Sequence, residues 1–148
     1  MTFDDTKIYA YFTIAMFIVA LLFGLPGLYS TFITEPAIES LIYHDNPSSQ
    51  QLKQAYIMLR KPHIFAGYNR YDEVGAGIEY ILKDFDLRVA EKKDFDVNDT
   101  MYLELLLERR KQGSDLSIKT MVFFVLLSLL GAIALVIEKT SKNRMKER

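Results

Sequence analysis

The chain of 148 residues contains no cysteine. This absence excludes disulfide bonds, zinc sites built on thiolates and cysteine nucleophiles. A small domain outside the cytosol often depends on disulfides, because its hydrophobic core is small. Any such domain of this chain must therefore be stabilised by packing against itself, against its own helices or against a partner.

Histidines and catalytic motifs are also scarce. The two histidines are His44, which precedes Asp45, and His63, and neither belongs to an HExxH-type pattern. The sequence has no P-loop, no G-x-G-x-x-G and no G-x-S-x-G motif. The acidic residues between Asp84 and Asp96 alternate with lysines and arginines, which is typical of a solvated surface. We therefore expect no catalytic residues, no metal site and no cofactor.

Neither positive nor negative charge is in large excess, because the formal net charge is -1. This balance gives no electrostatic reason to expect nucleic acid as a partner. The charges are unevenly distributed: Ile8–Tyr29 and Thr120–Ile137 contain no Asp, Glu, Lys, Arg or His. A helix needs about 20 apolar residues to cross a bilayer core. The two segments therefore predict two transmembrane helices, and we expect the first to be a retained anchor rather than a cleaved signal peptide.

Basic residues follow the second apolar segment, and they predict its orientation. Five lysines and arginines against two glutamates stand between Glu138 and Arg148. Because basic residues near a span tend to stay in the cytoplasm, both termini are expected there. These residues also favour contact with anionic lipid headgroups.

The predicted fold is a mainly α-helical membrane protein, in which a two-helix transmembrane hairpin carries a small extracytoplasmic, mostly helical domain. The predicted location is the inner (plasma) membrane. The expected segments are a cytoplasmic N-terminus (1–7), a first transmembrane helix (8–30), a periplasmic domain (31–117), a second transmembrane helix (118–138) and a basic cytoplasmic tail (139–148).

Helical spacing of apolar residues supports the helical prediction for the middle region. Pro36 is expected to open a first short helix, Ser48 or Ser49 to cap a second, and Asp99 to cap a last helix over 100–112. The buried stripes expected on these three helices are Ala37, Ile38, Leu41 and Ile42, then Leu52, Ala55, Tyr56 and Leu59, then Leu103, Leu106, Leu107 and Arg110.

Three further features of the sequence concern the boundaries of these helices. Asp72 to Asp84 shows helical spacing, and residues 85–97 fit either a β-hairpin or a continuing helix, with helix favoured. Pro26 is expected to kink or end the first span, since proline lacks a backbone donor. Gly113, Ser114 and Asp115 are expected to separate the last helix of the domain from the second span.

Two groups of residues are candidate contacts. Aromatic residues and arginine are enriched at interface hot spots. The sequence therefore offers a candidate contact with a partner protein, formed by Phe65, Tyr68, Arg70 and Tyr71. Small residues in the spans allow close helix packing, within the hairpin or against another subunit, and they are Ala20, Gly24, Ser128, Gly131 and Ala132.

The function most consistent with these features is that of a non-catalytic accessory, assembly or regulatory subunit of a larger membrane complex. Its expected partners are other membrane subunits or further copies of the chain. An extracytoplasmic ligand sensor is an alternative, although short tails would make it signal through a partner. A membrane-bound enzyme is a third alternative, which would need His44, His63 or an acidic pair to form its site.

Overall fold

The structure is a computed structural model that describes residues 5–61 and 76–146. Every regular element in these two ranges is helical. The elements are α1 (Asp5–Tyr29), the π-helix η1 (Ser30–Thr34), α2 (Glu35–Ile42), α3 (Ser49–Leu59), α4 (Ala76–Ala90), the 3₁₀ helix η4 (Val97–Asp99) and α5 (Thr100–Lys146). Two continuous helical stretches, Thr6–Ile42 and Val97–Met145, are long and apolar enough to cross a membrane. The mainly α-helical class and the two apolar helices agree with the sequence-based prediction.

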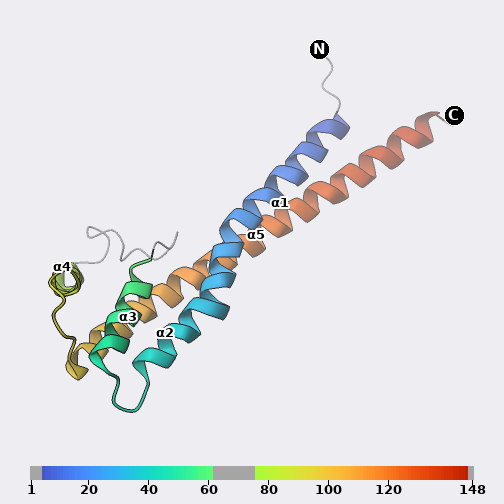
Figure 1. The fold of residues 1–148 in the computed structure, drawn as a ribbon. Helices are drawn as coiled ribbons and strands as arrows, with labels where there is room; N and C mark the ends of the chain where they lie inside the picture. Colours follow the sequence, from blue (N-terminus) through green and yellow to red (C-terminus); the bar gives the residue numbers. More distant parts are fainter. Residues whose placement is uncertain (1–4, 62–75, 147–148) are drawn as a thin grey trace. The chain divides into compact units, whose positions relative to one another are not determined.

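The chain divides into two compact units, which we name the terminal unit (Met1–Leu25 with Ile118–Arg148) and the middle unit (Pro26–Ser117). In the terminal unit, the first part of α1 and the second part of α5 lie side by side (Figure 1). The Ser128 hydroxyl donates to the Thr13 carbonyl oxygen at 3.0 Å, and Lys142 Nζ donates to Thr6 Oγ1 at 2.8 Å. These pairs show that the two segments run antiparallel.

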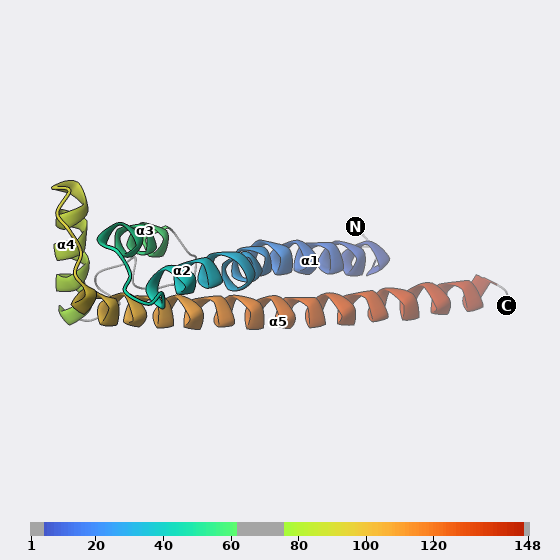
Figure 2. The ribbon, with the colours of Figure 1, turned by 60° about the horizontal axis from the view of Figure 1, so that its bottom comes forward.

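The described residues of the middle unit form a hydrophobic core, to which α2, α3, α4 and α5 all contribute. Helix α3 packs beside α2, as Figures 1 and 2 both show. Tyr56 lies at the aromatic centre of the core, 5.1 Å from the ring of Phe85 and 5.9 Å from that of Phe95. The buried residues are Ile38, Ile42, Leu52, Ala55, Tyr56, Leu59, Leu82, Phe85, Phe95, Leu103, Leu106 and Leu107. The predicted stripes of α3 and α5 are thus buried in full, whereas on α2 only Ile38 and Ile42 are.

Local capping explains where two of these helices begin. Ser48 and Gln51 form a reciprocal capping box at the start of α3, which confirms one of the two serines expected there. Helix α5 begins at Thr100, as predicted, but the capping residue lies earlier: Asp96 caps η4, and Asp99 completes that capping box. The segment 85–97 is helical through Ala90 and irregular from there to η4, so the favoured helix is correct for its first part.

Pro26 does not end the helical path. Helix α1 continues to Tyr29, and the chain then widens into η1, where the backbone N–H of Glu35 bonds to the Ser30 carbonyl oxygen. Helix α2 follows directly, with Pro36 in its first turn, as expected. A proline inside a helix is tolerated when neighbouring groups, or a local change to π-helix, satisfy the backbone carbonyl oxygens that lose their hydrogen bonds. Here Gly27 packs so closely that an added Cβ would fall 2.7 Å from the Ser117 Cβ.

The predicted break at Gly113 is wrong, because α5 is one helix from Thr100 to Lys146. A glycine inside a helix costs only about 1 kcal/mol relative to alanine. Gly113 and Ser114 are both buried, and the Ser114 hydroxyl donates to the carboxylate of Glu35. These tertiary contacts offset the low helix propensity of glycine, which a local pattern does not reveal.

Candidate functional site

A buried polar network joins α5 to the π-helix of the middle unit, and we name it the Arg110 network (Arg110, Ser30, Glu35 and Ser114). Arg110 Nε donates to the Ser30 hydroxyl at 2.9 Å, and that hydroxyl donates to Glu35 Oε1 at 3.1 Å. Ser114 donates to the same Glu35 oxygen. The exposed fractions are 4 % for Arg110 and 5 % for Glu35. Two oppositely charged groups are therefore joined through a serine away from bulk water.

Arg110 also reaches the end of α3. Its Nη1 atom donates to the carbonyl oxygen of Lys61 at 3.3 Å and approaches that of Leu59 at 3.5 Å. One side chain therefore links α5, η1 and the C-terminal end of α3. π-Helical turns occur frequently at functional sites, but the network lies inside the fold. Its geometry indicates a structural role, in which α5 holds the π-helix in place through buried hydrogen bonds.

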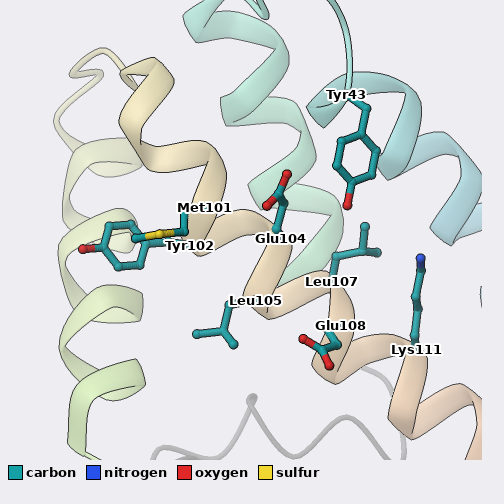
Figure 3. Close-up of a pocket in the computed structure, with 8 residues that line it drawn as sticks. All are labelled: Tyr43, Met101, Tyr102, Glu104, Leu105, Leu107, Glu108 and Lys111. Atoms are coloured by element: carbon teal, nitrogen blue, oxygen red, sulfur yellow. The ribbon is translucent and has the colours of Figure 1, made fainter.

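A surface groove runs along the outward face of α5, and we name it the α5 groove. The larger depression has a volume of about 550 Å³, and seven of its eight lining residues belong to α5 (Figure 3). The eighth, Tyr43, follows the end of α2 and is 61 % exposed. The lining residues are Tyr43, Met101, Tyr102, Glu104, Leu105, Leu107, Glu108 and Lys111.

The α5 groove continues toward the N-terminal end of α5. A second depression of about 470 Å³ shares Met101, Tyr102 and Glu104 with the first and adds Val97, Asn98 and Thr100. Val97 and Met101 are 58 % and 63 % exposed. From Val97 to Lys111 the groove extends over about 20 Å, at roughly 1.5 Å per helical residue. Its length and shallow, one-sided lining differ from the enclosed pocket typical of a small-molecule site.

The charges of the α5 groove are unbalanced. Its one cation, Lys111, forms an ion pair with Glu39 of α2. The hydrogen bond to Glu39 raises the pKa of Lys111 above its ordinary value, against the opposing effect of slight burial. Within residues 5–61 and 76–146, neither Glu104 nor Glu108 has a hydrogen-bond or ion-pair partner. The groove therefore presents two uncompensated carboxylates beside apolar side chains.

The small residues singled out in the two spans all lie in the terminal unit. An added Cβ at Gly24 would overlap the side chain of Met121, and one at Gly131 would fall 2.6 Å from Thr13 Oγ1. Ala20 and Ser128 are buried and Ala132 is half-buried. The two spans of one chain therefore approach each other closely at Gly24 and at Gly131, where a larger side chain would not fit.

The predicted aromatic contact of Phe65, Tyr68, Arg70 and Tyr71 lies outside the described residues, as does His63. His44 is exposed, and its Nδ1 lies 3.1 Å from the Asp45 carbonyl oxygen, which fits a turn. Within the described ranges no cluster of three histidine or carboxylate side chains is arranged to hold a metal ion.

The sequence pattern did not reveal the Arg110 network or the α5 groove. Arg110 was visible only as the polar member of an apolar stripe. Two signals were present: Glu35 is the first charged residue after the long uncharged run, and Ser114 follows Arg110 by one helical turn. Comparison with protein families, curated proteins and solved structures gives no match to this chain.

Proposed function

We propose that the protein is a non-catalytic subunit of a membrane complex, anchored by a two-helix hairpin and contributing the middle unit as an interaction module. The observation that carries this proposal is the exposed apolar surface of the terminal unit. In the apolar 18-residue window of each candidate span, only 11 % of the residues are buried. Helices this apolar and this exposed are unfavourable in water, since soluble proteins rarely expose apolar patches above a few hundred Å². A bilayer, together with neighbouring subunits, removes that surface from water.

The chemistry of the spans argues for an anchoring role. Ile8–Tyr29 and Thr120–Ile137 contain no Asp, Glu, Lys, Arg or His, whereas ion and proton pathways normally need such groups within the membrane. The polar contacts between the spans are simple, such as the Ser128 hydroxyl on a backbone carbonyl oxygen. The hairpin therefore suits holding and positioning rather than transport.

The proposed orientation follows from the basic tail. Lysines and arginines after Ile137 favour a cytoplasmic position for that end, and two spans then bring the N-terminus to the same side. The middle unit would lie outside the cytoplasm, at the inner (plasma) membrane. Its packed core, without any disulfide, and its surface groove fit a module that binds another protein.

Purification of the full chain from its native membrane in a mild detergent tests the proposal. We expect a defined partner, or further copies of the chain, to co-purify in fixed proportion through gel filtration with light scattering. A monodisperse monomer without a partner would count against the proposal. A single small molecule that strongly stabilised the full chain in a thermal-shift screen would favour a ligand sensor instead.

A further inference from the structure

We propose that the α5 groove binds a cationic, apolar-faced helix contributed by a different protein outside the bilayer. This inference rests on the proposed function, because it assigns the binding surface of the interaction module. It starts from an unusual property of α5, which has apolar side chains on two opposite faces.

The inward face of α5 carries the core residues Leu103, Leu106 and Leu107, all at most 1 % exposed. The outward face carries Met101 and Leu105, and Val97 of η4 precedes Met101 at the same four-residue spacing. Side chains at this spacing form a ridge along one side of a helix. Within the described residues of the middle unit, Val97 and Met101 remain more than half exposed. This ridge is long enough to pack against about two turns of a partner helix.

Charge decides what kind of helix fits. Glu104 and Glu108 flank the ridge, one helical turn apart, without a compensating partner among the described residues. Lys111 already pairs with Glu39 and so does not neutralise them. A partner with lysine or arginine one turn apart would place two cations against the two carboxylates, and Leu-type residues between them would cover Met101 and Leu105. Recognition of an amphipathic helix in a groove commonly uses this division between apolar anchors and rim charges.

A second copy of the chain fits this surface poorly. Two copies inserted in the same direction, related by an axis along the membrane normal, would carry α5 in the same direction along that normal. An isologous contact places the same surface patch of both copies against each other, so the patch that carries Glu104 and Glu108 would face itself. Like charges brought together across an interface are destabilising. The geometry therefore favours a different, basic partner over self-association through this groove.

The test uses the full chain in nanodiscs of zwitterionic lipid and three labelled 14-residue helical peptides. The probes are an amphipathic Leu/Lys peptide, its Leu/Glu counterpart, and a Ser/Lys peptide of equal charge without an apolar face. Fluorescence anisotropy is measured with binding to empty nanodiscs subtracted. We expect saturable binding of the Leu/Lys peptide only, since both the ridge and the carboxylates are needed.

Matched charge reversals assign the binding to the groove. The variant with Glu104→Lys and Glu108→Lys should bind the Leu/Lys peptide about tenfold more weakly and should gain binding of the Leu/Glu peptide. The control variant with Asp45→Lys and Glu91→Lys changes the net charge equally at other exposed positions and should bind as the unmodified chain does. Met101→Ser should weaken binding of the Leu/Lys peptide, although it does not change the charge of the groove.

Equal effects of the two charge-reversal variants, or no Leu/Lys binding at all, would overturn the inference. Co-purification of the Glu104→Lys and Glu108→Lys variant from the native membrane distinguishes a wrong groove assignment from a wrong proposed function. If the unmodified chain co-purifies with a partner and the groove variant keeps it, the groove assignment is wrong while the subunit role stands. If the unmodified chain has no partner, the proposed function itself fails.

Discussion

Replacing Arg110 with methionine should destabilise the middle unit strongly, because this side chain joins three elements through buried hydrogen bonds. Methionine preserves much of the apolar stem but none of the donors. The bond to Ser30, at 2.9 Å, has good geometry, whereas the contacts to the Lys61 and Leu59 carbonyl oxygens, at 3.3 and 3.5 Å, are long. A buried hydrogen bond from a charged donor contributes about 1.5–3 kcal/mol, and long contacts add little.

The loss also leaves Glu35 buried without the cation that reached it through Ser30. Together these effects predict a loss of about 2–4 kcal/mol in the free energy of unfolding. For a domain of fewer than about 100 residues, each kcal/mol lowers the melting temperature by about 4–8 °C. The expected decrease is therefore at least about 8 °C.

The absence of native cysteine provides the assay. Ala55 is fully buried in the core, so a single Ala55→Cys reporter in the full chain reacts with a thiol-specific dye only when the middle unit opens. Labelling is followed against temperature in detergent. The melting temperature of Arg110→Lys should lie between those of the unmodified chain and Arg110→Met, since lysine keeps the charge but loses the planar fork of donors.

The neighbouring arginine supplies the matched control. Arg109 is exposed, and within the described ranges it has no polar partner. Arg109→Met should change the free energy of unfolding by less than about 0.5 kcal/mol. If Arg109→Met and Arg110→Met lowered the melting temperature equally, the structural role given to the Arg110 network would be refuted. The double variant with Ser30→Ala should be less than additive, because both changes remove the same bond.

Three further predictions concern packing and buried polar groups. Tyr56→Phe removes a 2.6 Å bond to a carboxylate and should cost about 1–3 kcal/mol, whereas Tyr80→Phe, at a site 75 % exposed, should have no measurable effect in the same thermal labelling assay. Gly131→Leu should separate the two spans and abolish cross-linking of cysteines introduced at their contact, whereas Ala15→Leu, on an exposed face, should leave the cross-link intact. Thr100→Val should leave stability unchanged or raise it, because that buried hydroxyl has no partner among the described residues; a loss above about 1 kcal/mol in urea unfolding would contradict this.

The sequence predicts the regular parts of this fold because their signals are local. The uncharged runs define the two apolar helices, and apolar residues at helical spacing identify the buried faces of α3 and α5. The Ser48 capping box also lies within four consecutive residues. Each of these features depends on neighbours along the chain.

The features that the sequence did not predict depend on contacts between distant residues. Gly113 remains helical because Ser114 bonds to Glu35, which is 79 positions away. Helix α1 continues past Pro26 to Tyr29, and the neighbouring Gly27 packs against Ser117, which is distant in the sequence. The periodicity of Leu103, Leu106 and Leu107 does not indicate the α5 groove, because it identifies the buried face of α5 and not the second apolar ridge on the opposite face.

Thiol accessibility across the membrane tests the central claim, a two-span hairpin with the middle unit outside the cytoplasm. Single cysteines replace Gln50 and Ser141, both exposed, and Leu126, which lies in the second apolar run. Intact spheroplasts are treated with a membrane-impermeant maleimide. We predict labelling of Gln50→Cys at once, of Ser141→Cys only after permeabilisation, and of Leu126→Cys only after the protein is unfolded in detergent. Labelling of Gln50→Cys and Ser141→Cys from the same side, or of Leu126→Cys in intact spheroplasts, would contradict the account.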